Sequence, residues 1–518
     1  MPFINLNSAD PIASATIFDI TIIGAGAAGI LMALKLASGG KNVCMLESGC
    51  MEYDSSKQDL NNLQQTGKFL SNAIEGRRRI VGGTTTAWGG QSLPFSEFDF
   101  SRRPWLDLPE WPFSYEEVSQ YYAEANAFLK VDGLNYTSDI FENIKLNPPA
   151  FDGNKITYHV AKWAPEPDFK KLYYTELEKK VTVYYNAHLT KIEHEFGRIS
   201  SVAITNFSQK KYELSVKKLV ITAGSIETVR ILLTNNINDI SGVLGKGFMD
   251  HPCIKIAKAE VARMYSFQRY FNTHQWRGKK YSIRLSIAPD YQRKAKILSC
   301  SASFMFFQKE NNFDLYAEMK EFWRDKRIKR LPKILLQYPK IIMSLFALVK
   351  HRFFYKGGSE ATLVLMTEQE CMNSSSITLS EMKDKFGVPR ASLHWDLSKK
   401  SWETVVKSAE VLKCEVERLG LAKINLLNNI NPGIVEWKEN LFDVNHHMGG
   451  ARLGASPQKS VVNENLQLWS IKNAFICSSA VFPTSSHSNP TLTILALGCR
   501  LTKYLLNTNE ADEIKSPH

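Results

Sequence analysis

The sequence has few cysteines, and nothing in their arrangement indicates a metal site or a disulfide framework. The eight cysteines are scattered along 518 residues, none forms a CxxC pair, and several lie in apolar runs. This pattern is typical of reduced, buried thiols. The eleven histidines also lack the spacing of zinc ligands. We therefore expect no metal site.

Targeting signals, repeats and low-complexity tracts are lacking as well. Residues 1–14 contain no basic segment, no apolar run of signal-peptide length and no twin-arginine pair, which is typical of a cytoplasmic protein. With 44% hydrophobic and 22% charged residues, the composition is that of a folded globular protein. The length is too great for one simple core and predicts two or three lobes.

Acidic residues are scarce in one part of the chain. Residues 320–356 hold eleven Lys or Arg against Glu321 and Asp325, a net charge of +9 that leaves only +3 for the rest. A nucleic-acid binder would also show a recognition module, and none is present, so we expect no nucleic-acid partner.

The apolar residues inside this basic stretch are too few to cross a membrane. Residues 334–349 are interrupted by Gln337, Pro339 and Lys340, whereas a span needs about 20 apolar residues. Two interpretations remain open. Either the segment lies on the anionic inner face of a membrane, where a lipid-linked sugar would be a fitting substrate, or it is a lid or an oligomer contact with a solvated basic side.

The start of the chain carries the strongest motif. Residues 17–23 are apolar and branched, which predicts a buried parallel strand. They lead into Gly24-x-Gly26-x-x-Gly29 and an apolar segment, 30–37, that predicts a helix. A second predicted strand, 42–46, follows.

This order of elements is the one that pyrophosphate binding requires. Gly24 permits a tight turn, Gly26 lets the backbone approach phosphates, and Gly29 lets the helix pack on the strand. The helix N-terminus then offers free N–H groups and the positive end of its dipole. Glu47 ends the second strand, where its carboxylate can accept hydrogen bonds from the hydroxyls of an adenosine ribose. The alternative is a glycine-rich structural turn.

A second glycine-rich segment follows. Gly82-Gly83 and Gly89-Gly90 bracket small hydroxyl residues, so that backbone can lie against a flat ligand such as an isoalloxazine ring. The alternative is a surface loop. Residues 77–79, three consecutive arginines, either face phosphates or form a solvated cluster.

Five separated segments of the chain form one recognisable series. They are the start described above with 46–49 (LESG), 81–90 (VGGTTTAWGG) followed by 110–115 (EWPFSY), 219–228 (LVITAGSIET) with 244–252 (LGKGFMDHP), 446–454 (HHMGGARLG), and 481–484 (VFPT) with 488–493 (SNPTLT). Together these segments resemble the glucose–methanol–choline (GMC) family of FAD oxidoreductases, especially its sugar-oxidising, pyranose-oxidase-like branch. They occur in the family's order from residue 18 to about residue 500.

The resemblance implies an α/β fold (α+β overall) with two domains. A Rossmann-like FAD-binding domain is assembled from residues 1–95, 176–255 and 436–518, and the last part carries the active-site residues. Residues 256–435 form a substrate domain with an antiparallel sheet flanked by helices. Residues 96–175 are a mixed insertion on the substrate side.

The resemblance also implies the residues that bind FAD. They are Gly24, Gly26, Ala27, Ala28, Gly29, Glu47, Gly82, Gly83, Thr84, Thr86, Ala87, Trp88, Gly89, Leu189, Ala223, Gly224, Ser479, Asn489, Pro490 and Thr491. In the family's covalently flavinylated sugar oxidases a histidine occupies the position of Ala87. Alanine cannot form that bond, so we expect noncovalent FAD.

The catalytic residues implied by the resemblance are His446 and Asn489. His446 would remove the hydroxyl proton, as the near-neutral pKa of histidine allows, and Asn489 would hydrogen-bond the substrate oxygen. Pro490 keeps Asn489 out of the helical region, ahead of a predicted helix over 491–506. His447 fits a supporting role. His487 either reaches the substrate or lies in a surface loop, and His251 is usually structural in the family.

These observations predict an FAD-dependent enzyme that oxidises an alcohol to a carbonyl by hydride transfer to flavin N5, and they favour a hydroxyl of a sugar or glycoconjugate as the substrate. The alternatives are a lipid or sterol alcohol oxidase with the same His–Asn pair, and an FAD-containing lyase without redox turnover. The sequence leaves open the electron acceptor, and with it the choice between oxidase and dehydrogenase.

Overall fold

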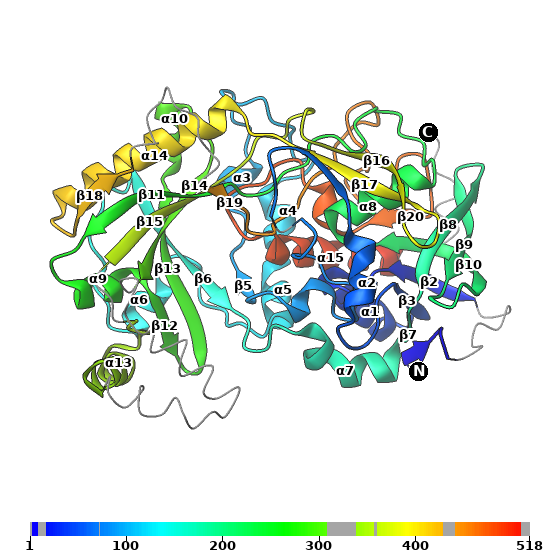
Figure 1. Ribbon diagram of the computed structural model, residues 1–518, viewed down its shortest axis with the longest axis horizontal. Coiled ribbons are helices and arrows are strands. Elements are labelled where there is room, and N and C mark those ends of the chain that lie inside the picture. Colours follow the sequence, from blue (N-terminus) through cyan, green and yellow to red (C-terminus); the bar gives the residue numbers. More distant parts are fainter. Residues whose placement is uncertain are drawn as a thin grey trace.

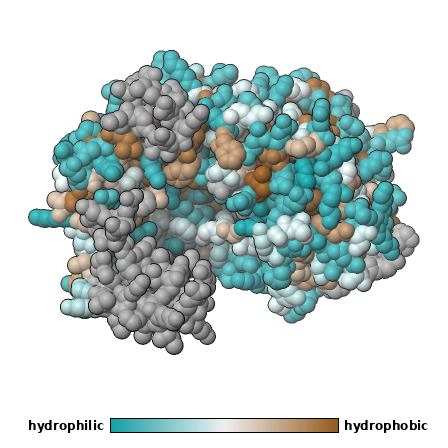
Figure 2. All heavy atoms as spheres, in the orientation of Figure 1, coloured by the Kyte–Doolittle hydropathy of each residue, from teal (hydrophilic) through white to brown (hydrophobic). Residues whose placement is uncertain are grey.

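A computed structural model of the protein describes residues 3–8, 17–71, 73–307, 338–356, 360–427 and 441–508. Two large sheets organise it, one at the right and one at the left of Figure 1, with helices packed around both. One hydrophobic core runs through both lobes, from Ile22 in the first sheet to Leu285 in the second. On the face shown in Figure 2 the described surface is mainly hydrophilic, with hydrophobic residues interspersed.

The first sheet has the order β1-β7-β3-β2-β10-β9-β8, and β20 also pairs with β10. Pairing is parallel from β1 to β10 and for β20, and antiparallel among β8, β9 and β10. The strands are β1 (Phe3–Asn5), β2 (Phe18–Ile23), β3 (Val43–Glu47), β7 (Thr182–Tyr185), β8 (His188–Glu195), β9 (Arg198–Thr205), β10 (Lys211–Ile221) and β20 (Ala474–Ile476).

Helices cover this sheet because its central strands are apolar on both faces. Every residue of β2 except Asp19 is buried, as expected for a parallel strand covered from both sides. The helices are α1 (Ala27–Ser38), α7 (Phe169–Lys180), α8 (Gly224–Thr234) and α15 (Pro490–Asn507). Helix α1 packs against β2, β3, α7 and α15. The predicted Rossmann-like half is therefore confirmed.

The second sheet has the order β18-β11-β15-β14-β13-β6-β5, with β12 on β13 and β19 on β11. All its pairs are antiparallel. The strands are β5 (Gln91–Ser92), β6 (Ile156–Trp163), β11 (Cys253–Glu260), β12 (Thr273–Trp276), β13 (Lys279–Ile287), β14 (Cys300–Phe307), β15 (Glu360–Thr367), β18 (Lys423–Leu426) and β19 (Leu441–Phe442). Helix α14 (Lys399–Arg418) lies against β14, β15 and β18, and α9 (Met264–Phe271) lies against β13. This is the predicted antiparallel sheet flanked by helices.

A small third sheet joins the two lobes. Strand β4 (Gln64–Gly67) pairs parallel with β17 (Pro389–Trp395), which pairs antiparallel with β16 (Ser376–Lys383). Both β16 and β17 contact α8 of the first lobe. A hairpin from the middle of the chain therefore packs beside the nucleotide-binding sheet.

Shorter elements complete the described chain. They are α2 (Ser55–Gln58), α3 (Glu97–Phe100), α4 (Tyr115–Ser119), α5 (Tyr122–Phe128), α6 (Asp139–Asn143), α10 (Pro289–Ala295), α13 (Tyr338–His351), and the 3₁₀ turns Asp59–Asn61, Gly83–Thr86 and Ser479–Val481. The eight cysteines are free thiols, of which Cys414 is exposed. Of the basic stretch over 320–356, the part up to residue 337 lies outside the described residues.

Candidate active site

A cavity of about 780 Å³ begins at the glycine turn after β2 and extends to His446 and Asn489. Both lobes line it. The first lobe supplies the ends of β2 and β3, the start of α8 and the start of α15. The second supplies Gln91 on β5, Trp163 on β6 and Arg284 on β13. One cavity therefore connects the dinucleotide-type glycine turn with the His446–Asn489 pair.

The glycine turn has the geometry that the motif predicts. Gly24 has a φ of +100°, which residues with a side chain rarely adopt. A Cβ at Gly29 would collide with the carbonyl oxygen of Gly24, so α1 can start this close to the strand only with glycine there. Gly26, Ala27 and Ala28 line the cavity, which places the N-terminus of α1 against it. That end of a helix favours an anion.

Glu47, at the end of the neighbouring strand β3, accepts hydrogen bonds that stabilise this turn. Its Oε2 accepts a hydrogen bond from the Ala25 N–H at 3.0 Å, and its Oε1 accepts one from the Gly49 N–H at 2.7 Å. Burial raises the pKa of Glu47 despite these hydrogen bonds. The carboxylate also lines the cavity, so the same group can hold the turn and reach a ribose.

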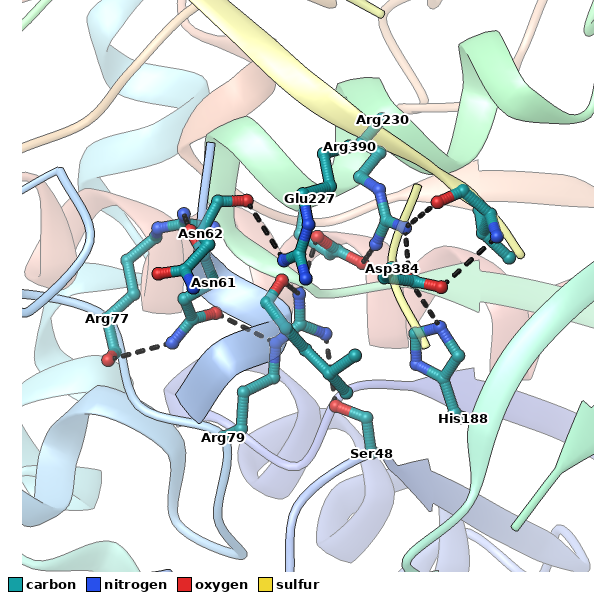
Figure 3. Close-up of polar contacts among 12 residues, drawn as sticks. Ser48, Asn61, Asn62, Arg77, Arg79, His188, Glu227, Arg230, Asp384 and Arg390 are labelled. Atoms are coloured by element: carbon teal, nitrogen blue, oxygen red, sulfur yellow. Dashed lines mark hydrogen bonds and ion pairs between the residues drawn. The ribbon is translucent and has the colours of Figure 1, made fainter. Parts of the chain in front are cut away.

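One of the three arginines, Arg79, belongs to a buried ion-pair network (Figure 3). Arg79 pairs with Glu227 on α8 at 2.6 Å and donates to Ser48 Oγ and Asn61 Oδ1. Arg77 donates to backbone carbonyls of Ala73 and Asn61. Arg79 is therefore buried rather than solvated, whereas Arg77 and Arg78 are half-buried, and all three line the cavity.

The network continues across α8 to the third sheet. Arg230 joins Glu227 to Asp384, and Asp384 lies 3.4 Å from His188 Nε2 (Figure 3). Burial alone would raise the pKa of Glu227, but Arg79 and Arg230 outweigh it and lower that pKa to about 2. The network thus fixes α8, the 77–79 loop and β8 around one end of the cavity.

The other end of the cavity holds two histidines in direct contact. His446 Nδ1 lies 2.8 Å from His251 Nδ1, and His251 Nε2 lies 3.1 Å from the carbonyl oxygen of Ser485. On the other side of the ring, His446 Nε2 lies 3.2 Å from Asn489 Nδ2. Asp250 Oδ1 accepts hydrogen bonds from the backbone N–H groups of His251 and His446.

These contacts allow one arrangement of protons when both rings are neutral. A carbonyl can only accept, so His251 Nε2 carries a proton and His251 Nδ1 carries a lone pair. His446 Nδ1 must then donate to it, which leaves the lone pair of His446 on Nε2. That lone pair lies beside Asn489, inside the cavity. His446 is therefore oriented to accept a proton there.

Burial keeps these histidines neutral. It lowers the pKa of His446 well below its usual value, and the neighbouring His251 and His447 lower it further. Burial also lowers the pKa of His251 to about 4 and that of His447 to about 3. Asp250 shows the opposite effect, because burial raises its pKa to about 8.

Most residues predicted to bind FAD line the cavity. Gly29, Gly82 and Thr86 are not among its lining residues, and Thr86 instead donates to the Gly83 carbonyl. The lining residues are Gly24, Gly26, Ala27, Ala28, Glu47, Gly83, Thr84, Ala87, Trp88, Gly89, Leu189, Ala223, Gly224, Ser479, Asn489, Pro490 and Thr491.

His487 lies neither at the cavity nor in a surface loop, the two positions predicted for it. It is buried, so the surface-loop interpretation is wrong, and it is not among the residues that line the cavity. Its Nδ1 lies 2.6 Å from Ser299 Oγ and its Nε2 lies 3.1 Å from Ser286 Oγ. His447 also lines the cavity, and its Nε2 lies 3.8 Å from Asp250 Oδ2.

Sequence reasoning missed three residues. His251 was assigned a structural role, yet it contacts His446 directly. Gln91 and Arg284 carried no motif, yet both line the cavity. His251 lies in the run 244–252 that resembles the GMC family, which is a usable signal, whereas no local pattern marks the other two.

Comparison with known proteins finds similar enzymes. The family model described as GMC oxidoreductase matches residues 372–498. The 2-methyl-1,2-propanediol dehydrogenase of Mycolicibacterium austroafricanum is 21% identical over 95% of this chain and 96% of its own. The fructose dehydrogenase large subunit of Gluconobacter japonicus is 22% identical over 94% of this chain and 98% of its own.

Residues 372–498 thus match the GMC oxidoreductase model, and nearly the whole chain is similar to dehydrogenases of that family. Formate oxidase of Aspergillus oryzae RIB40 shares its fold, with a TM-score of 0.60 and 14% identity over 97% of this chain and all of that one. These similarities confirm the prediction of an FAD-dependent oxidoreductase that acts on CH–OH groups.

Proposed function

We propose that this GMC oxidoreductase oxidises a hydroxyl group of a sugar or glycoconjugate to a carbonyl. The observation that carries this proposal is the pair of polar side chains at the substrate-lobe end of the cavity. Gln91 Nε2 is buried without a hydrogen-bond partner, and Gln91 Oε1 accepts from Arg284 at 3.3 Å. Burial lowers the pKa of Arg284, a sign of a guanidinium that is poorly solvated.

Unpaired donors of this kind favour an oxygen-rich ligand. A buried donor without an acceptor costs about 1–3 kcal/mol, which a substrate hydroxyl can recover. Among the ion pairs of the described residues, none joins Arg284 to a carboxylate. A lipid or sterol alcohol would leave these donors unpaired. One of the relatives, fructose dehydrogenase, is named for a sugar substrate, in agreement with this preference.

His446 acts in this proposal as the base that takes the hydroxyl proton, at Nε2. Bound FAD supplies the acceptor for the hydride from the same carbon, at flavin N5. Asn489 holds the substrate oxygen beside Nε2, since its amide already lies 3.2 Å from that atom. His251 fixes the tautomer of His446 by accepting the Nδ1 proton, and it is therefore a positioning residue.

We also propose that the FAD is held without a covalent bond. Ala87 lines the cavity beside Trp88 and Gly89, and its methyl group offers no nucleophile. Acid precipitation of the purified protein tests this directly. Free FAD in the supernatant is the expected result, and flavin that stays with the precipitate would contradict it.

Anaerobic titration with candidate substrates tests the function. We expect a panel of sugars and glycosides to bleach the flavin absorbance, and long-chain alcohols or sterols to do so far more slowly. The reverse order would show that the enzyme is a lipid alcohol oxidase. Bound flavin that no alcohol reduces would instead favour the lyase alternative.

A further inference from the structure

Helix α13 turns an apolar face toward the solvent. Tyr338, Ile342, Leu345 and Val349 are exposed and follow one another at spacings of four, three and four residues, which places them on one side of the helix. Phe346 and Met343 flank this row and are exposed as well. An amphipathic helix on a globular protein normally directs such a row into the core.

The inner side of α13 is already packed, so the outward row does not result from a loosely attached helix. Ala347 is fully buried, and Ser344 Oγ donates to the Tyr355 carbonyl at 3.0 Å. After the helix, the backbone of residues 352–354 hydrogen-bonds to β12 through Gln275 and Thr273. Tyr265 of α9 contacts the rings of four residues of this segment, namely Phe346, His351, Phe353 and Tyr355.

The surroundings of this face are positively charged. Residues 338–356 contain four Lys or Arg and no Asp or Glu. Residues 261–289 include the adjoining α9, β12 and β13, and they contain six Lys or Arg and no Asp or Glu. Lys350, Arg352, Arg263 and Arg277 are exposed. In the sequence, residues 320–337 add seven Lys or Arg against two acidic residues.

We propose that α13 docks this protein on an anionic lipid bilayer, with the row at 338, 342, 345 and 349 inserted among the lipids. Apolar side chains beside Lys and Arg match such a surface, because the side chains enter the acyl boundary and the cations face lipid phosphates. A second copy of this chain is a poorer occupant, because two such basic surfaces repel each other. In the part of the chain that the structure describes, no helix has the length and hydrophobicity of a membrane span.

Vesicle co-sedimentation of the FAD-bound full chain tests the proposal. We expect binding to vesicles of phosphatidylcholine mixed with phosphatidylglycerol, much weaker binding to phosphatidylcholine alone, and a loss of binding as salt rises. The variant Ile342→Gln/Val349→Gln should bind at least about tenfold more weakly, because two apolar side chains no longer enter the lipid.

A matched control comes from exposed apolar residues elsewhere on the molecule. Ile342 and Val349 are 61% and 70% exposed, and Ile240 and Phe69, which lie outside α13, are 55% and 73% exposed. The control Phe69→Gln/Ile240→Gln should bind vesicles like the wild type. Flavin content and anaerobic reduction should be unchanged in both variants, which separates docking from catalysis and from misfolding.

Two results would overturn the proposal. One is the absence of binding to anionic vesicles at low salt. The other is equal binding by the wild type and by Ile342→Gln/Val349→Gln. Sedimentation of the wild type and of this variant without lipid measures their oligomeric state. A wild type that is a dimer and binds no vesicles, with a variant that is a monomer, would show that the surface joins two copies of the chain.

Discussion

His251 and His446 form a hydrogen bond between their Nδ1 atoms at 2.8 Å, although 195 residues separate them in the sequence. The carbonyl of Ser485 fixes the proton of His251 on Nε2, and this in turn fixes the proton of His446 on Nδ1. The basic nitrogen of His446 therefore faces Asn489. The tautomer of the proposed base follows from its neighbours alone.

Replacement of His251 by leucine should lower kcat by roughly 100- to 10,000-fold, because His446 loses the acceptor that fixes its tautomer. KM should change little, since His251 is not among the cavity-lining residues. His251→Asn offers an Oδ1 acceptor near the position of Nδ1 and should retain much more activity. Steady-state kinetics of both variants, with flavin content as the folding control, checks this. Equal activity of the two variants would contradict a positioning role.

The pH dependence of kcat/KM should reflect the lowered pKa of His446. Burial disfavours its charged form, so the ring stays neutral and able to accept a proton well below pH 6.5. We expect activity to be level across neutral pH and to fall only in a more acidic range. A fall that is half complete at pH 6.5 or above would show that this histidine is solvated in the working enzyme.

Asp250→Asn should stabilise the protein, and more so as the pH rises. The buried carboxyl has a pKa of about 8, against 3.8 for an ordinary aspartate. Between these two pH values the unfolded chain is ionised while the folded protein keeps its proton, so the free energy of unfolding of the wild type falls as the pH rises. The free energy of unfolding of the variant, relative to that of the wild type, should therefore increase from about pH 4 to pH 8, by at most about 1.4 kcal/mol per pH unit. The groups that face Asp250 are the N–H groups of His251 and His446, the His447 ring and Asp443.

Urea unfolding of this variant at pH 5 and pH 8 measures the effect. The asparagine keeps an oxygen for the two backbone donors, so the fold is preserved. The exposed Asp290, paired with Arg293 on α10, provides a control, because Asp290→Asn should give no comparable slope. A gain that is the same at both pH values would show that Asp250 is not held protonated.

Arg284→Met should weaken sugar binding more than turnover. Loss of one buried donor corresponds to about 1–3 kcal/mol, so we expect KM for a sugar substrate to rise about tenfold or more. Bleaching by a hydrophobic alcohol should be unaffected or improved. Arg293→Met, on the exposed side of α10, is the matched control. An unchanged KM would place the sugar away from Arg284.

Local features of the sequence predicted much of the fold. The strand, turn, helix and strand over 17–47 appear as β2, the Gly24 turn, α1 and β3, and the predicted helix over 491–506 is α15. Each depends on neighbouring residues, such as the glycine that tolerates a φ of +100° or the proline that starts a helix. Such rules need no knowledge of distant segments.

The features that sequence reasoning missed all depend on distant contacts. The Arg79–Glu227 pair joins a loop to α8 across 148 positions, and no composition rule brings such residues together. The same holds for Gln91 and Arg284, which meet only because β5 and β13 both flank β6. The outward face of α13 could not be assigned either, since an apolar row in a sequence does not show which side the core lies on.

The rate of flavin reduction in His446→Ala tests the central claim most directly. With a sugar that bleaches the wild type under anaerobic conditions, we predict that the variant still binds FAD but is reduced at least about 100-fold more slowly, because the hydroxyl proton has no acceptor. Reduction of the variant at the wild-type rate would contradict the account.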